Sequence, residues 1–399
     1  QDKLKRFPVS EKIKKDLLSW KYAKDMPNDD HMTNAWLDSM TYKDFIEKVM
    51  GLDVAVTRFA DPVLASAGGM GCDVMSAYIA KQLGMYGLYP DAPVNPLNRH
   101  SFPGGNDGFA RHFVKLLIPS AITGKNNFED IMNNPINFNN LDREENKIRL
   151  RLSSNVIDVH HTSKSVNVTY YKNNELTKIN TKAVVMASGG WVNKHIISDL
   201  PQTHKDAYEQ FNHAPMLVAN VALTNWRFLK KLGITAYQWT GGFGFHTNIR
   251  KPMHVGNYKP DLDPDKPITL TFYVSFEKTN QGLSAKEQSR LGQYEMLGKS
   301  FMQYEREIRE QMVRMFGSSG FDPKNDIAGI ILNRWGHAYV TPTPGFFYTP
   351  EGDPGYADII KTQPFGRVSF GHSELRGYQH WGPAAAEGSR AVDQISEFI

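Results

Sequence analysis

A run of short segments with the two-residue alternation of β-strands lies between residues 148 and 187, and it constrains the fold more than any other feature. Each segment is rich in β-branched residues and is bounded by polar turns. These segments are Ile148–Leu152, Asn155–His161, Val166–Tyr171 and Leu176–Asn180. The apolar segment Ala183–Ala187 follows and predicts a buried strand that ends at Ser188, Gly189 and Gly190. The sequence therefore predicts a β meander followed by a buried strand.

Helices and further strands are predicted on both sides of this meander. Ser10 can cap a helix at Glu11–Ala23, Thr41 can start another, and an apolar helix is expected at Phe109–Leu117. An amphipathic helix is predicted at Ser300–Phe316, with Phe301, Tyr304, Ile308, Met312, Met315 and Phe316 on one side. Other predicted strands are Met216–Leu223, Ile268–Phe276, Ile327–Trp335 and Arg367–Phe370. This order favours an α+β or mixed α/β fold over a parallel βαβ array.

Composition excludes several classes of protein. The 399 residues are 40% hydrophobic, which is enough for one large core or two interleaved domains. A net charge of +4, without a basic run interleaved with aromatic residues, argues against nucleic acid as a partner. We find no apolar run long enough to predict a transmembrane segment. The lone Cys72 excludes a disulfide within the chain, and no histidine pair has the spacing of a metal site, so no metal is predicted.

The last 35 residues combine a strand, a short acidic turn and a helix rich in small residues. The strand ends near Gly371, Glu374 lies in the turn, and Gly382, Pro383 and Ala384 open the helix expected at Pro383–Phe398. The first turn of a helix presents free N–H groups and a partial positive charge, which suits an electron-rich ring edge. An ordinary strand–turn–helix with glycine for packing is the alternative that this spacing leaves open.

With these residues the chain resembles the flavin amine oxidase superfamily, and most closely the spermidine dehydrogenase-like bacterial flavoproteins. The resemblance runs in order over residues 40 to 399. Its matching stretches are His100–Asn106, Phe109–Pro119, Arg149–Val156, Asn220–Trp226, Phe301–Arg309, Gly320–Pro323, Asn333–His337 and the C-terminal element. It implies an incomplete FAD-binding, Rossmann-type domain that is interleaved with a substrate-binding domain of sheet and helices.

The same resemblance implies which residues contact FAD. Glu374 would accept hydrogen bonds from ribityl hydroxyls, and Val156 and Ile157 would flank the adenine. The remaining expected contacts are Ala187, Ser188, Gly189, Gly371, Tyr378, Gly382, Pro383 and Ala384. A solvent-facing meander with a glycine turn is the alternative for the segment around residue 189.

Aromatic side chains and histidines form the expected substrate face. Trp335, His337 and Tyr339, with Tyr378 and His380, would exclude water and hold an amine, since electron-rich rings favour a cation. Trp239, Phe243, Phe245 and His246 are equally consistent with this wall and with core packing. Carboxylates that could bind a further ammonium group are Asp73, Asp107 and Glu374.

One family motif has no counterpart in this sequence. The family begins with a strand, GxGxxG and a helix, which grip the FAD pyrophosphate. Gly68-Gly69-Met70-Gly71 is the nearest candidate, but it follows Arg58–Ala67, which has no strand pattern, so close helix packing is the better interpretation. We therefore expect either that a second polypeptide carries the motif, in a hetero-oligomer, or that this chain is the C-terminal portion of a protein from which the motif has been removed.

These expectations combine into a domain plan and a function. Residues 1–147 form the helical part of the substrate domain, 148–213 the meander and returning strand of the FAD domain, 214–365 the substrate domain, and 366–399 the FAD-contacting end. The expected activity is hydride transfer from a C–N bond of an amine, polyamines included, to FAD. The alternatives are a flavin-dependent desaturase or dehydrogenase of a non-amine substrate, and a non-catalytic partner subunit. No leader is visible, and analogy slightly favours an exported, periplasmic location over the cytoplasm.

Overall fold

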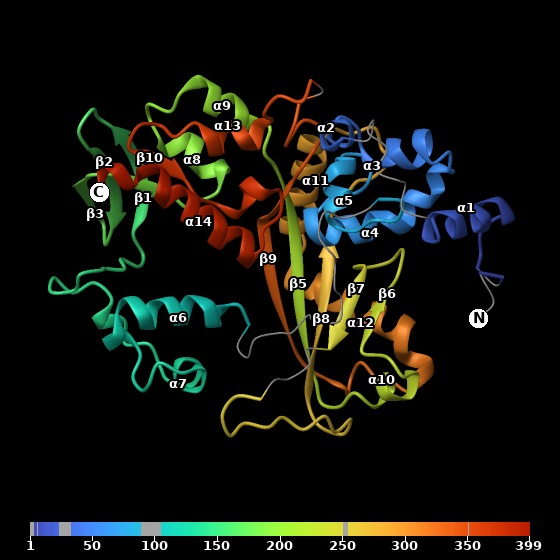
Figure 1. Ribbon diagram of the computed structural model, residues 1–399. Helices are drawn as coiled ribbons and strands as arrows, with labels where there is room; N and C mark the ends of the chain where they lie inside the picture. The colour runs from blue at the N-terminus through green and yellow to red at the C-terminus, as the bar shows by residue number, and fades with distance from the viewer. Residues whose placement is uncertain (1–3, 6, 24–32, 89–104, 250–253, 350) are drawn as a thin grey trace.

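The computed structural model describes residues 4–5, 7–23, 33–88, 105–249, 254–349 and 351–399. Two long strands, β5 and β9, run through the middle of the molecule (Figure 1). N-terminal helices lie on one side of them, and the meander with the C-terminal helix lies on the other. Helix and sheet are both abundant, so the mixed fold class predicted from the sequence is confirmed.

The N-terminal part is a cluster of short helices. They are α1 Glu11–Lys21, α2 Asn34–Asp38, α3 Tyr42–Asp44 continued by a π-helical turn at Phe45–Val49, α4 Thr57–Gly68 and α5 Ala77–Gln82. The hydroxyls of Ser10 and Thr41 accept hydrogen bonds from the first turns of α1 and α3, as the sequence predicts. Inside the cluster, Trp20 Nε1 donates to the buried Tyr42 hydroxyl over 2.9 Å.

The Gly68–Gly71 segment ends helix α4. Gly69 has φ of 72°, and a Cβ at this position would lie 2.3 Å from Cβ of Ala214. Thr341 Oγ1 donates to the Gly68 carbonyl over 2.7 Å. Glycine is required because the helix end packs against β5, which confirms close packing as the explanation for these residues.

A five-stranded antiparallel sheet forms the centre, with strand order β6–β7–β8–β5–β9. Its strands are β5 Asn212–Leu223, β6 Ala236–Gln238, β7 His246–Ile249, β8 Ile268–Ser275 and β9 Ile327–Thr341. α10 Arg227–Leu232, α11 Ala285–Gly298 and α12 Phe301–Phe316 accompany it. The predicted strands at β5, β8 and β9 are confirmed, although β5 starts four residues earlier and β9 ends six residues later than expected.

Helix α12 covers one face of this sheet. Its residues Tyr304, Ile308, Met312 and Phe316 are fully buried, as predicted. Phe301 was expected on the same side, but this first residue of the helix is 45% exposed. Trp239 and Phe243 belong to this core, so core packing explains these two aromatic residues.

The meander and the returning strand form two small sheets. The antiparallel sheet contains β1 Asn155–His161, β2 Val166–Lys172 and β3 Glu175–Thr181, while β4 Val184–Met186 pairs in parallel with β10 Val368–Phe370. The strand predicted at Ile148–Leu152 is wrong. Arg149 and Arg151 instead pair with Asp142 at 2.6 and 3.3 Å, which holds this segment as a loop.

Helices cover the β4–β10 pair. They are α8 Gly190–Ile196, α9 Gln202–Glu209, α13 Tyr356–Thr362 and α14 Trp381–Ile395, with a 3-10 turn, η7, at Ser373–Arg376. Helix α14 begins two residues before the predicted start and packs back along β10, where Ser369 Oγ donates to the Ala391 carbonyl. Other 3-10 turns are η2 Val54–Val56, η4 Pro119–Ala121, η5 Phe138–Asn140, η6 Gly317–Ser319 and η8 Ser396–Phe398.

A small unit with α6 Asp107–Leu117 and α7 Phe128–Asn133 lies beside α14 (Figure 1). Its own core contains Ile118, Ala121 and Leu141. Phe109 of α6 stacks on Trp381 of α14 with ring centroids 4.1 Å apart. The predicted helix is confirmed and starts at Asp107, while Pro103 and Gly104 of the preceding loop lie outside the described residues.

Candidate functional site

The carboxyl ends of β4 and β10 lie side by side, and a glycine-containing segment follows each strand. Ala187–Gly190 leads from β4 into α8, and Gly371–Glu374 leads from β10 into η7. The Gly190 N–H donates to Glu374 Oε1 over 2.6 Å. A Cβ at Gly190 would lie 2.4 Å from the Tyr208 ring, so only glycine allows this approach. Ligands of open α/β sheets bind at this edge.

A buried, hydrogen-bonded pair of side chains connects this edge to the central sheet. Glu374 is 0% exposed, and its Oε2 lies 2.7 Å from His213 Nε2 on β5. His213 is itself 4% exposed. The Glu374 N–H also donates to His372 Nδ1 over 3.3 Å. Glu374 was predicted to face a ribityl chain, and the structure places it inside the protein with both oxygens already bonded.

Trp191 brings the histidines of three segments together. Its ring stacks on His337 of β9 at 4.8 Å with an 8° angle between the planes. It meets His213 edge-on at 4.6 Å and His372 at 6.1 Å. We call Trp191, His213, His337, His372 and Glu374 the edge cluster. Of these residues, only His337 and Glu374 were predicted from the sequence as site residues.

Burial sets the charge state of two of these histidines. Partial burial lowers the pKa of His337, and the neighbouring His213 lowers it further, against the opposing effect of Glu374. Burial also lowers the pKa of His372, which Glu374 opposes. Both imidazoles therefore favour the neutral form at neutral pH. No group of three metal-binding side chains occurs in the described ranges.

A bulge in β9 aims His337 at the cluster. Tyr339 pairs with Ala214 and Trp335 with Met216, so residues 336–338 lie opposite Pro215 alone. Proline has no N–H for the ladder, which explains why regular pairing fails there. Bulges of this kind redirect side chains beside active sites. The displaced Gly336 carbonyl accepts a hydrogen bond from Gln293 Nε2 over 2.9 Å.

The two other predicted β9 residues flank this bulge. Trp335 is 59% exposed, and burial raises the pKa of the half-buried Tyr339. His246, predicted as either wall or core, has its ring 5.5 Å from Tyr273 on the adjoining strand. Phe245 is buried.

The turn before α14 contacts β9, whereas several of the residues predicted around the start of α14 border a separate cavity. Gln379 Oε1 accepts from the Val340 N–H of β9 over 3.0 Å, which puts this turn beside the central sheet. Tyr378, Gly382 and Pro383 instead border a cavity between α13 and α14. His380 precedes the helix without making a side-chain cap, and Ala384 is exposed.

The remaining predicted contacts lie on the meander side. Val156 and Ile157 are 39% and 48% exposed on β1, and Ile157 falls in an irregular part of its pairing. Ser188 Oγ is 2.5 Å from Asn193 Oδ1 in α8, so its side chain points toward that helix. Asp73 accepts from the Asn280 N–H, and Asp107 lies in the first turn of α6, so neither belongs to the edge cluster.

Two solved amine oxidases have a fold similar to this arrangement of a central sheet beside a β4–β10 edge. The chain is similar to cyclohexylamine oxidase from Brevibacterium oxydans IH-35A, with a TM-score of 0.53 and 14% identity, covering 91% of this chain and 68% of that one. It is also similar to a mutant of putrescine oxidase, with a TM-score of 0.62 and 14% identity over 98% of this chain and 77% of that one. No family model and no curated protein matches the sequence. At this identity the likeness shows the fold.

Proposed function

We propose that this chain forms the substrate-binding part and the flavin-closing end of an FAD-dependent oxidoreductase that acts on amines. The observation that carries the proposal is the stacking of His337, from the substrate sheet, on Trp191 at the carboxyl edge of β4 and β10. This contact joins the two places where the fold would hold substrate and cofactor. The similar solved structures are of a cyclohexylamine oxidase and a putrescine oxidase.

The residues around the start of α14 fit a bound flavin. Gln379 Nε2 is buried without a partner in the described part of the chain, and a buried donor of this kind calls for an acceptor. A Cβ added at Gly382 or Gly388 would meet nothing within 4 Å, so one side of α14 is open. Gly371, Gly189 and Gln379, in the turn before α14, would hold FAD, which supplies the hydride acceptor when bound.

The chain's own residues would bind and orient the amine. The rings of Trp335 and Tyr339 exclude water from the sheet side, and electron-rich rings attract a cation. A neutral His337 leaves the wall uncharged, so a protonated amine is not repelled. The buried His213–Glu374 pair fixes the position of the edge relative to β5.

A polyamine substrate, as in the spermidine dehydrogenase-like flavoproteins, is the narrower form of this proposal. Exposed apolar residues of β9, Ile331 at 65% and Trp335 at 59%, favour the alternative of an apolar, non-amine substrate. The comparisons give no support for a separate second polypeptide, so we propose only that FAD binding also uses residues with no counterpart in this sequence.

Anaerobic reduction of the flavin tests the proposal. The protein, purified with any partner it carries, should be yellow, and the visible absorbance of its oxidised flavin should bleach with an amine. A Trp335→Ala variant should keep its flavin and lose most of the reduction rate, while exposed Tyr22→Ala should behave as wild type. Bleaching by alcohols or fatty chains and by no amine would favour the alternative. A protein without flavin would refute both.

A further inference from the structure

The structure contains a second cavity outside the edge cluster. It has a volume of about 530 Å³ and lies between α5, the 347–348 loop, α13, η7 and the first turns of α14. This is the size of pockets that hold small organic ligands. We call it the α13–α14 cavity; it shares no residue with the edge cluster.

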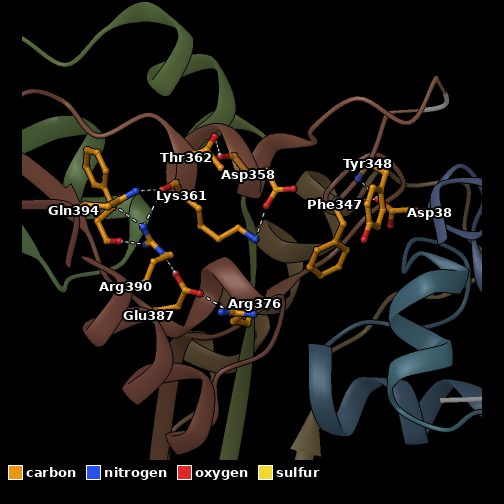
Figure 2. Close-up of polar contacts among 11 residues, drawn as sticks. Asp38, Phe347, Tyr348, Asp358, Lys361, Thr362, Arg376, Glu387, Arg390 and Gln394 are labelled. Carbon is orange, nitrogen blue, oxygen red and sulfur yellow. Dashed lines mark hydrogen bonds and ion pairs between the residues drawn. The ribbon is translucent and has the colours of Figure 1, made fainter. Parts of the chain in front are cut away.

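Charged residues from two elements border this cavity. Lys361 Nζ and Asp358 Oδ1, both on α13, are 2.5 Å apart and balance one another. Arg376 of η7 donates from Nε to Glu387 of α14, which is 0% exposed. Figure 2 shows the Lys361–Asp358 and Arg376–Glu387 contacts, with the Phe347 ring beside them.

The positive charge is in excess at this place. Glu387 also pairs with Arg390 Nε at 2.8 Å, so two guanidinium groups share a single carboxylate (Figure 2). Arg390 is occupied further by the Lys361 carbonyl and Gln394. Among the described residues, Arg376 is bonded only through Nε, and its side chain is 48% exposed. Its terminal nitrogens are therefore available to bind an anion in the two-point manner typical of arginine, and Arg376 lines the cavity.

Aromatic rings form the opposite wall. Tyr78 of α5 meets the rings of Phe347 and Tyr348 at 5.0 and 5.5 Å, in edge-to-face contacts. Buried Asp38 holds these two loop residues in place because its Oδ2 accepts from both backbone N–H groups, at 2.8 and 2.9 Å (Figure 2). The wall is thus fixed before any ligand arrives.

We propose that the α13–α14 cavity binds an aromatic monocarboxylate. The ring of this ligand would pack against Tyr78 and Phe347. Its carboxylate would accept hydrogen bonds from the terminal N–H groups of Arg376. One uncompensated guanidinium matches a single negative charge, and the adjacent Asp358 disfavours a dianion such as a phosphate ester. Tyr378 and Pro383 border the same cavity, so a ligand would touch the turn that precedes α14.

Calorimetric titration of the full protein with benzoate tests this site. Arg376→Gln should weaken the Kd about tenfold, the effect expected for a charge-assisted hydrogen bond. Ala386→Trp fills the cavity without removing a contact and should weaken it at least as much. The matched control is Arg143→Gln, because Arg143 is 49% exposed and lies outside the cavity. Its Kd should stay within about twofold of wild type.

Further arms separate the ligand classes and the two sites. Benzylamine should bind at least about tenfold more weakly than benzoate, since it reverses the charge. Inorganic phosphate that displaced benzoate with the same dependence on Arg376 would reduce the cavity to a plain anion site and overturn the aromatic part. Trp335→Ala should leave benzoate binding unchanged even if it abolishes flavin reduction, so this proposal can fail independently of the proposed function. Equal affinities of the Arg376→Gln and Arg143→Gln variants, both with native circular dichroism, would overturn it.

Discussion

Removal of the Glu374 side chain is expected to be among the most destabilising single changes to this protein. Glu374 is 0% exposed and binds the Gly190 N–H at 2.6 Å and His213 Nε2 at 2.7 Å. Glu374→Ala leaves His213 buried without its partner, and breaking a buried pair in this way costs about 3–5 kcal/mol. The free energy of unfolding should fall by this amount.

The Glu374→Gln variant separates the contribution of the Gly190 hydrogen bond from that of the contact with His213. Glu374→Gln keeps an acceptor for Gly190 and removes the charge facing His213, so it should cost about 1–3 kcal/mol. The matched control is Asp265→Asn, which breaks the exposed Arg227–Asp265 pair, 66% and 68% exposed, and should cost under about 0.5 kcal/mol. Urea unfolding followed by tryptophan fluorescence measures all three. If Glu374→Ala loses no more than Asp265→Asn, the pair does not join the two halves of the molecule.

Three further outcomes follow from the same contacts. Gly190→Ala places a Cβ 2.4 Å from the Tyr208 ring and should lower the free energy of unfolding in urea by about 1–3 kcal/mol. Gly233→Ser is the control: its Cβ has open space, so any loss there measures backbone strain without a side-chain clash. Burial raises the pKa of Asp38 from 3.8 to about 6. The contribution of its protonated form to the free energy of unfolding is therefore full below pH 3.8 and is lost as the pH rises through 6. The wild type should therefore lose up to about 3 kcal/mol more than Asp38→Asn between pH 4 and 7, and parallel pH profiles would contradict this. Tyr378→Ala should lower turnover more than FAD content; equal losses of both would assign Tyr378 a structural role.

Local sequence patterns predicted the elements well where the pattern and the environment agree. Strands β1 to β4 and helix α12 were predicted from local patterns alone: alternation or clustered β-branched residues for β1 to β3, an apolar run for β4 and helical spacing for α12. Ile148–Leu152 has the same alternation but no partner strand, and ion pairs to Asp142 hold it as a loop. An alternating pattern predicts which side chains of a strand share a face, but it does not predict whether a neighbouring strand is present to pair with it.

The edge cluster was predicted only in part, because its members come from four segments that tertiary packing brings together. Trp191 and His213 have no motif around them: one follows the Gly189–Gly190 turn and the other lies in a strand of apolar residues. A signal was nevertheless present for His213. A charged or polar residue in an otherwise buried strand requires a partner, and Pro215 two positions later interrupts pairing at the same place.

Glu374 shows that a sequence resemblance can identify an important residue without predicting its contacts. The family pattern identified the acidic residue of the turn and assigned it to a cofactor hydroxyl, and this needs a carboxylate surface open to ligand. In the structure the carboxylate is 0% exposed and bonded to Gly190 and His213. A carboxylate has about four acceptor positions, so a third bond is chemically allowed, but the fully buried Glu374 offers no surface for it in this structure. Since Gly190 is held by Tyr208 on its other side, the structure favours Glu374 as the residue that positions the edge and leaves direct contact to its exposed neighbours.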